Sequence, residues 1–317
     1  MCFVRGRVGV YVVAGAAMGL ALLLAVLGVG EEAGALTDWQ ALVLGVVQGL
    51  TELLPISSSG HLILVPWLAD WTYLEEHDEF NQTFDVALHL GTLVAVVAYF
   101  WRDVLRLLAA WFGSVVRRAV ATQDERLAWA VFVATIPAAL AGALGEDFIV
   151  NHLGEPWQIA LFLPFFGIVL LVVDRRRPQT RDLETVGIKE GLAIGVAQSL
   201  ALAPGVSRSG ITITAGRFIG LDRDSAARLS FLLLIPTTLG AVIWKGLNDL
   251  VLGDLPPGWQ GPFVVGMLGA LASGLVAIVF LLGFVRRHSY APFVVYRIAV
   301  AVLVLGLIAS GVRDAGF

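Results

Sequence analysis

Two stretches of sequence, 150 residues apart, decide the fold. The first reads GVVQGLTELLPISSSG at residues 45–60, and the second reads GVAQSLALAPGVSRSG at residues 195–210. Glycine, valine, glutamine, leucine and two serines coincide at this offset, and both stretches end in glycine. Each stretch interrupts an apolar segment (Trp39–Trp67 or Gly187–Arg217) with proline, glycine and serines, which break helices. We therefore predict an internal repeat built on two broken helices.

The composition around this repeat is that of a membrane protein. The chain has 317 residues, is 58% hydrophobic with a mean hydropathy of +0.83, and has only 15% charged residues, against about 25% in soluble domains. A net charge of −4 with clustered basic residues argues against nucleic-acid binding. The single cysteine, Cys2, excludes an internal disulfide framework, a cysteine-rich zinc site and a protein-held iron–sulfur cluster. The absence of Walker, HExxH and CxxC motifs argues against nucleotide-driven transport and zinc proteolysis.

Apolar runs of about 20 residues predict the membrane-spanning helices. Six are expected, over Phe84–Trp101, Ala128–Gly145, Ile159–Val173, Ala226–Lys245, Phe263–Val285 and Phe293–Ser310. A further apolar run, Val8–Gly30, predicts an extra N-terminal helix, which we favour over a cleaved signal ending near Ala35. We divide the chain into an N-terminal hydrophobic extension, residues 1–36, and a membrane-embedded domain, residues 37–317.

The charges of the connecting links predict the topology. The links Arg102–Arg126 and Asp174–Lys189 are rich in arginine and are placed in the cytoplasm, whereas Glu75–Glu79 and Asn248–Gln260 are placed outside. This alternation holds only if both broken segments dip into the membrane and return to the side from which they came. The first would enter from outside and the second from the cytoplasm. We therefore expect an all-α polytopic protein with six spans, two re-entrant hairpins and an inverted-topology repeat, whose halves are about 39–145 and 187–285.

The repeat differs between its copies at chemically informative positions. Glu52 is matched by Leu202, and His61 by Ile211. Ser58 is matched by Arg208. Ionisable residues inside a membrane are energetically unfavourable and by default indicate function. The hairpins therefore bring a carboxylate, hydroxyls, an imidazole and a guanidinium to one predicted site, where freed backbone N–H groups would also suit an anion.

Each of these residues also has a structural interpretation. Arg208 is either a bidentate phosphate ligand or half of an ion pair with Glu52. His61 is either a proton-transfer or nucleophilic group or an interior histidine with satisfied hydrogen bonds. Glu52, outside an ion pair, could act as a base, a metal ligand or an orienter of His61. Gln48, one helical turn before Glu52, suits a supporting role, and His89 in an apolar run is interpreted as a packing residue.

At these residues the chain resembles a known family. Residues 48–62 (QGLTELLPISSSGHL) and 204–210 (PGVSRSG) closely resemble the undecaprenyl-diphosphate phosphatase family, the bacitracin-resistance type. The similarity runs from about Trp39 to Ser310 and includes Phe231–Pro236 and Tyr296-Arg297. Residues 1–36 lie outside the pattern.

The resemblance implies a bacterial inner-membrane enzyme that hydrolyses the C55 isoprenyl diphosphate to the monophosphate and so recycles the carrier lipid for peptidoglycan synthesis. It implies six spans plus two re-entrant hairpins, a site open to the external face, and a divalent cation, Mg²⁺ or Ca²⁺. Membrane lipids are its other expected partners, and a homodimer is left open. Many members carry a second glutamate where this chain has Gln48, which argues against a metal site with two carboxylates.

Catalytic roles are expected for Glu52, Ser58, His61 and Arg208, with Ser58 favoured as nucleophile and His61 and Glu52 as proton handlers. The residues expected to hold the phosphate are Ser57, Ser59, Gly60, Ser207, Arg208, Ser209 and Gly210. Glu52, with support from Gln48, is the expected metal residue. A secondary transporter or lipid flippase is the alternative, because inverted repeats and broken helices are typical of that class. A purely structural scaffold would leave the polar residues unexplained.

Overall fold

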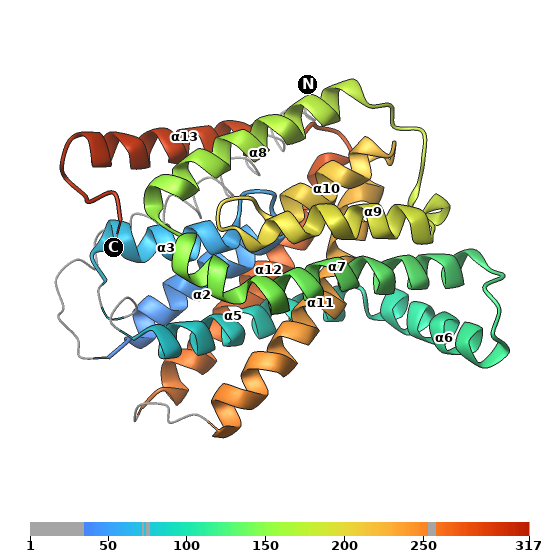
Figure 1. Ribbon diagram of the computed structural model, residues 1–317, viewed down its shortest axis with the longest axis horizontal. Coiled ribbons are helices and arrows are strands. Elements are labelled where there is room, and N and C mark those ends of the chain that lie inside the picture. Colours follow the sequence, from blue (N-terminus) through green and yellow to red (C-terminus); the bar gives the residue numbers. More distant parts are fainter. Residues whose placement is uncertain (1–34, 72, 74–76, 253–257, 317) are drawn as a thin grey trace, which may run out of the picture.

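The computed structural model describes residues 35–71, 73, 77–252 and 258–316, and this part of the chain is helical throughout apart from its turns and links (Figure 1). The predicted N-terminal helix Val8–Gly30 and part of the acidic stretch Glu75–Glu79 lie outside the described residues. The described helices are α2 (Asp38–Leu53), α3 (Ser58–Ala69), α5 (Asp78–Tyr99), α6 (Trp101–Arg117), α7 (Gln123–His152), α8 (Pro156–Arg176), η1 (Leu183–Thr185), α9 (Ile188–Ser199), η2 (Leu200–Leu202), α10 (Arg208–Phe218), α11 (Arg223–Leu252), α12 (Gln260–Val285) and α13 (Ala291–Ala309).

The six predicted spans are confirmed. Helices α5, α7, α8, α11, α12 and α13 each contain a stretch long and apolar enough to cross a membrane. One predicted boundary is wrong, because α5 ends at Tyr99 and Trp101 begins the separate helix α6. Helix α6 is amphipathic, with apolar and polar side chains on opposite faces. It exposes apolar side chains such as Leu105 and Phe112, and it does not continue the span.

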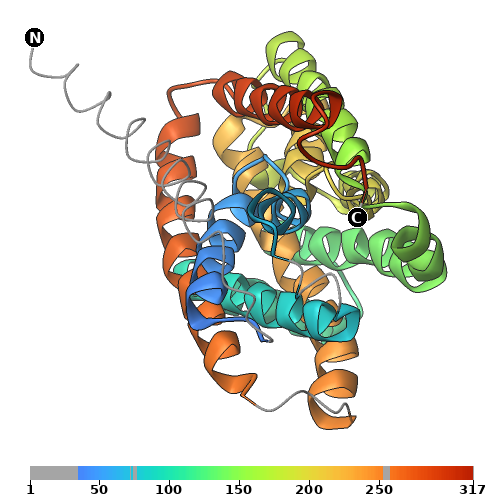
Figure 2. The same ribbon diagram turned by 90° about the vertical axis from the view of Figure 1, so that its left-hand side faces the viewer.

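Two helix pairs do not belong to the series of spans: one precedes α5, and the other lies between α8 and α11. Helices α2 and α3 have 16 and 12 residues, and α9 and α10 have 12 and 11. None of the four reaches the length of about 20 residues that a span requires. Within each pair the two helices pack against each other, so both broken segments form helical hairpins. Most of α2 is buried, whereas α9 buries one face and exposes Leu192 and Val196 on the other. Figure 2 gives a second view of the arrangement.

The breaks in the two hairpins have the same backbone conformation. Ser57 precedes α3 with φ 78° and ψ 97°, and Ser207 precedes α10 with φ 76° and ψ 113°. In both hairpins the serine hydroxyl caps the following helix, since it accepts a hydrogen bond from the N–H of Gly60 (3.4 Å) or Gly210 (3.1 Å). The left-handed region is unfavourable for serine, so the same unusual conformation at two positions related by the repeat is strong structural support for their equivalence.

Each hairpin packs against a helix of the other half of the chain. Helix α2 packs on α12 of the second half, whereas α9 packs on α7 of the first half. The contacts are backbone to backbone, because a Cβ atom built on Gly45 would lie 2.1 Å from the carbonyl oxygen of Gly266, and one on Gly195 would lie 2.4 Å from that of Ala134. Gly45 and Gly195 are themselves mates in the repeat. The orientation of the two halves across a membrane stays a prediction.

The arginine-rich links meet at one end of the bundle. Arg286, after α12, lies 2.8 Å from Asp224 at the start of α11, and Arg106 of α6 lies 3.4 Å from Asp124 at the start of α7. Asp174 is fully buried between Arg217 and Arg223, whose Nε atoms lie 3.0 and 2.8 Å from its Oδ1. One cleft at this end is lined by Arg106 and Asp124 of the first link and by Glu184 of the second, so the links that we assign to the cytoplasm lie together.

Candidate active site

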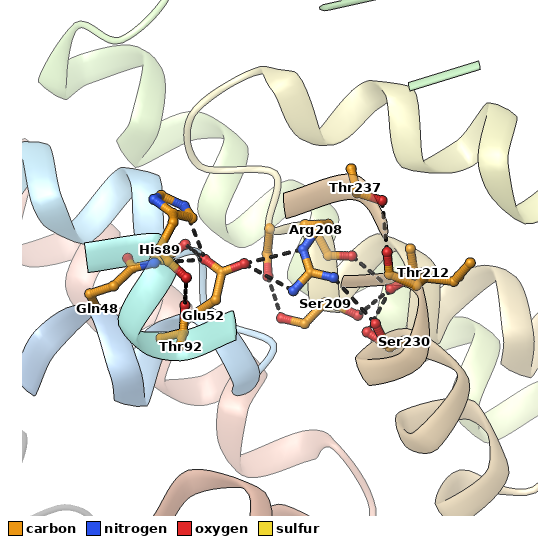
Figure 3. A network of polar contacts seen from close by, with 12 residues as sticks. Gln48, Glu52, His89, Thr92, Arg208, Ser209, Thr212, Ser230 and Thr237 are labelled. Atoms are coloured by element: carbon orange, nitrogen blue, oxygen red, sulfur yellow. Dashed lines mark hydrogen bonds and ion pairs between the residues drawn. The ribbon is translucent and has the colours of Figure 1, made fainter. Parts of the chain in front are cut away.

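Glu52 lies where the two hairpins meet. It stands one residue before the end of α2, and its side chain is only 5% exposed. One carboxylate oxygen, Oε1, accepts hydrogen bonds from Arg208 of the other hairpin, from Nε at 3.1 Å and from Nη2 at 2.9 Å (Figure 3). A buried carboxylate needs such a partner, so the pair joins the hairpins as well as placing a charge between them.

The other oxygen of Glu52, Oε2, receives three polar groups. The hydroxyl of Ser58, the first residue of α3, donates a short hydrogen bond to it. The amide Nε2 of Gln48 donates at 3.3 Å, and Nε2 of His89 lies 3.6 Å away. The two oxygens thus face different groups: a guanidinium on one side, and a hydroxyl, an amide and an imidazole on the other.

Arg208 starts α10 and is 14% exposed in its side chain. Besides the bonds to Glu52, its Nη1 donates to the carbonyl oxygen of Ser230 at 3.2 Å. The ion pair that the sequence left as one interpretation is therefore present without substrate. The same carboxylate also holds the Ser58 hydroxyl, so a permanent positive charge and a hydroxyl group lie close together.

The hydrogen bonds of His61 are made to Ser57 and Tyr296 and not to Glu52. Its Nδ1 donates to the carbonyl oxygen of Ser57 at 2.7 Å, which leaves Nε2 to accept from the hydroxyl of Tyr296 at 2.8 Å. The rings of His61 and Tyr296 also stack, and His61 is only 3% exposed. Both ring nitrogens therefore have partners that hold the hairpin in place, and a catalytic role for His61 stays a prediction.

The serines predicted to hold phosphate divide into two groups. The Ser57 hydroxyl accepts from the N–H of Gly205 (3.1 Å) in addition to capping α3, and the Ser209 hydroxyl donates to the carbonyl oxygen of Leu54 at 2.9 Å. The Ser207 hydroxyl caps α10 and lies 3.3 Å from that of Ser209. These three hydroxyls, all buried, serve the fold. Ser59 is half-buried in the first turn of α3.

The first turns of α3 and α10 both begin at the breaks, and both contain a predicted glycine. A Cβ on Gly60 would lie 3.1 Å from Ile159, and one on Gly210 would lie 3.1 Å from Arg297, so larger residues would crowd these turns. The first N–H groups of a helix have no partner within the helix and favour an anion. Two such ends beside Arg208 suit a phosphate.

Sequence reasoning missed two residues. The interpretation of His89 as a packing residue is wrong, because its side chain is 33% exposed and faces Glu52. Arg297 of α13 had no assigned role, yet it is fully buried and donates to carbonyl oxygens of both breaks, at Pro55 (3.4 Å) and Gly205 (2.8 Å). A buried arginine inside an apolar span was a usable signal. For His89 the sequence carried none, since nothing in it pairs α5 with α2.

Comparison with known proteins places the chain in a family. The profile of the family described as Bacitracin resistance protein BacA matches residues 41–303. A protein of Thermomicrobium roseum named Undecaprenyl-diphosphatase is 47% identical over 283 residues, which cover 87% of this chain and 99% of the relative. One of Moorella thermoacetica with the same name is 45% identical, over 86% and 98% of the two chains. Undecaprenyl-diphosphatase 2 of Stutzerimonas stutzeri is 46% identical over the same shares.

Proposed function

The chain belongs to the family of the bacitracin resistance protein BacA, and from this premise we propose that it hydrolyses undecaprenyl diphosphate to undecaprenyl phosphate and inorganic phosphate. Relatives named undecaprenyl-diphosphatase match it over almost their whole length. The reaction would return the carrier lipid to peptidoglycan synthesis. Six apolar helices in the described part of the chain make the protein a multi-pass membrane protein, which suits a substrate with a long prenyl chain.

The observation that carries the proposal is the shared contact of Ser58 and Arg208 with Glu52. The carboxylate accepts the proton of the Ser58 hydroxyl, so the serine oxygen can attack the terminal phosphorus while Glu52 takes up that proton. The bond from phosphorus to the bridging oxygen breaks, and undecaprenyl phosphate leaves with the electron pair. Water then releases inorganic phosphate from the serine. Attack by a water molecule deprotonated by Glu52 gives the same products.

Arg208 would hold the terminal phosphate. Its planar guanidinium can turn from Glu52 towards phosphate oxygens and neutralise the charge that grows in the transition state. The N-terminal N–H groups of α3 and α10 would supply further donors. His61 would act mainly by fixing the start of α3, because both its nitrogens have partners in the substrate-free protein.

A divalent cation remains part of the proposal. In the described residues no three His, Cys, Asp or Glu side chains gather at one place, so these residues do not by themselves offer a set of charged ligands. One carboxylate, Glu52, fits a cation that takes most of its oxygens from the diphosphate and water, as Mg²⁺ commonly does. When bound, such a cation would neutralise charge on the diphosphate.

We propose the bacterial inner membrane as the location and the external face as the side on which the site opens. The charge alternation of the links supports this orientation. In a Cys2→Ser background, Asp314→Cys, after α13, should react with an impermeant thiol reagent on cells whose outer membrane, if present, is permeabilised, whereas Asp182→Cys should not. Labelling of Asp182→Cys alone would reverse the orientation.

The activity itself is tested with purified protein in detergent, where no gradient exists. We expect release of inorganic phosphate from undecaprenyl diphosphate, and loss of this release in Ser58→Ala protein of normal thermal stability. A flippase would release none under these conditions. In cells, expression should raise resistance to bacitracin, the property by which the family is described.

A further inference from the structure

Two arginines are fully buried in the described part of the chain, and they differ in their partners. Arg217 of α10 lies 3.0 Å from the carboxylate of Asp174 and also donates to backbone carbonyl oxygens. Arg297 of α13 is equally buried, but its five hydrogen bonds within the described residues all go to backbone carbonyl oxygens. A buried charge without a counter-charge is unfavourable, and inside a membrane it indicates a function by default.

The hydrogen bonds of Arg297 join the two breaks. Its Nη1 donates to the carbonyl oxygen of Pro55 (3.4 Å), and its Nη2 donates to those of Gly205 (2.8 Å) and Val206 (3.1 Å). These acceptors lie within two residues of the serines that precede α3 and α10. The remaining bonds attach the guanidinium to α8. One side chain thus fixes the two hairpins relative to each other at the point where their second helices begin.

The same bonds orient the peptide groups of the second break. In a trans peptide unit the C=O and the N–H point in opposite directions, so the N–H of Ser207 points away from Arg297 while the C=O of Val206 points towards it. Helices α8 and α13 lie together on one side of the hairpins, and α5 and α11 lie on the other (Figure 1, Figure 2). It is α5 and α11 that contact Glu52 and Arg208. The N–H of Ser207 is therefore directed towards the side on which the phosphate would bind.

We propose that Arg297 is a positioning residue of the phosphate site, which holds the N–H groups of the breaks towards the phosphate and supplies an unpaired positive charge behind them. Glu52 and Arg208 form a neutral pair, so Arg297 leaves the site with an excess of one positive charge, which the anionic terminal phosphate would balance. The guanidinium need not touch the phosphate, because charges interact over several ångströms away from bulk water. The inference deepens the proposed function and rests on it for the identity of the anion.

The experiment measures binding without turnover. The probe is an isoprenyl methylene-bisphosphonate, a diphosphate analogue that cannot be hydrolysed, titrated by calorimetry into purified protein in detergent. The isoprenyl alcohol of the same chain length is the uncharged reference ligand. We expect Arg297→Gln to weaken bisphosphonate binding at least about tenfold, since a unit charge is removed from a region with an effective dielectric constant of about 20. Binding of the alcohol should change less than about threefold, because it depends on apolar burial.

Arg297→Lys separates the charge from the geometry. Lysine keeps the positive charge, but its ammonium group lacks the planar fork that reaches both breaks. We expect bisphosphonate binding at least about threefold weaker than in the wild type but tighter than in Arg297→Gln. Wild-type affinity in Arg297→Lys would overturn the proposal, also if Arg297→Gln does not fold. Lysine that binds no more tightly than glutamine would overturn it as well, because the charge would then have no role.

Arg217→Gln is the matched control. Arg217 is as buried as Arg297 and also donates to backbone carbonyl oxygens, but it lies at the arginine-rich end of the bundle. The substitution should lower the thermal melt, because Asp174 loses one of its two arginine partners, and should leave the bisphosphonate affinity of the folded protein unchanged. Equal weakening by Arg217→Gln and Arg297→Gln, or absence of binding in the wild type, would overturn the proposal. Wild-type protein that binds the bisphosphonate but releases no phosphate from undecaprenyl diphosphate would instead count against the proposed function.

Discussion

The two hairpins share a backbone plan and differ in their chemistry. Ser57 and Ser207 adopt the same left-handed conformation and cap the following helix in the same way. Gln48 and Gln198 are both buried, but Gln48 donates to the carboxylate of Glu52, whereas Gln198 donates to the neutral hydroxyl of Thr237 at 3.3 Å. Positions common to the two hairpins hold the breaks, and positions that differ carry the charges.

This division explains how a membrane interior accommodates a reactive site. Each break is fixed by hydrogen bonds that cross to the other hairpin, from Gly205 N–H to the Ser57 hydroxyl (3.1 Å) and from the Ser209 hydroxyl to Leu54 (2.9 Å). Arg297 of α13 donates to carbonyl oxygens of both breaks as well. With the breaks held in this way, Glu52 in one hairpin and Arg208 in the other can oppose each other as a charged pair.

The largest expected effect is that of Glu52→Gln. The substitution keeps the shape but removes the base and leaves Arg208 without its counter-charge. Loss of a general base typically lowers turnover by about 10²–10⁴-fold, and we expect a value at the upper end. Phosphate release and the thermal melt should be measured together. The control is Leu202→Gln, which introduces the same residue at the matching position of the second hairpin and should change turnover by less than about threefold. A Glu52→Gln enzyme with turnover within tenfold of the wild type would contradict the view that the charged positions carry the chemistry.

Arg208→Lys should have the next largest effect on turnover. Lysine keeps the charge but loses the planar fork that can bind two oxygens at once. Removing a donor aimed at transition-state charge commonly costs about 100- to 1,000-fold in turnover. The variant should fold, because lysine can still pair with Glu52. Near-normal phosphate release by folded Arg208→Lys protein would mean that the arginine serves only the ion pair.

The close helix contacts at Gly45 and Gly195 should contribute about equally to the stability of the protein. Gly45→Ala and Gly195→Ala each push a Cβ into a backbone carbonyl, so each should lower the free energy of unfolding by about 1–3 kcal/mol. Gly283→Ala in α12 is the control, because nothing lies within 4 Å of a Cβ there. Denaturation in detergent measures all three. A large loss of unfolding free energy for only one of Gly45→Ala and Gly195→Ala would show that one half of the chain contributes most of the stability.

The smallest effect is expected at the capping serines. Ser57→Ala and Ser207→Ala remove an N-cap and should each cost about 1 kcal/mol of stability. Glycine at either position should cost less than alanine, because it also tolerates the positive φ. Thermal melts of the four variants test this order, and alanine proving milder than glycine would rule out the capping account.

Much of the fold could be predicted because its signals are local. The six spans follow from runs of apolar residues, and both breaks follow from Pro55, Pro204 and the serines beside them. The end of α5 was misplaced because Trp101 is apolar, while its place at the start of an amphipathic helix depends on the following residues. The residues now in contact with Glu52 include two of the predicted catalytic residues, Ser58 and Arg208.

The remainder of the site depends on distances that one sequence does not contain. The chemistry of Arg208 and Glu52 allowed an ion pair as readily as two separate roles, and only the packing of the hairpins places them 2.9 Å apart. The pairing of His61 with Tyr296 joins residues 235 positions apart. His89 looked like a packing residue because its neighbours in sequence are apolar, yet the helix turns it towards a carboxylate on α2.

The central claim is tested most directly by two adjacent serines, one at a shared position and one at a position that differs. We would measure phosphate release from undecaprenyl diphosphate and the thermal melt for Ser57→Ala and Ser58→Ala in parallel. The account predicts that Ser58→Ala melts like the wild type but loses at least about 1,000-fold in turnover, whereas Ser57→Ala is less stable and keeps measurable turnover. A folded Ser58→Ala enzyme that releases phosphate at nearly the wild-type rate would contradict it.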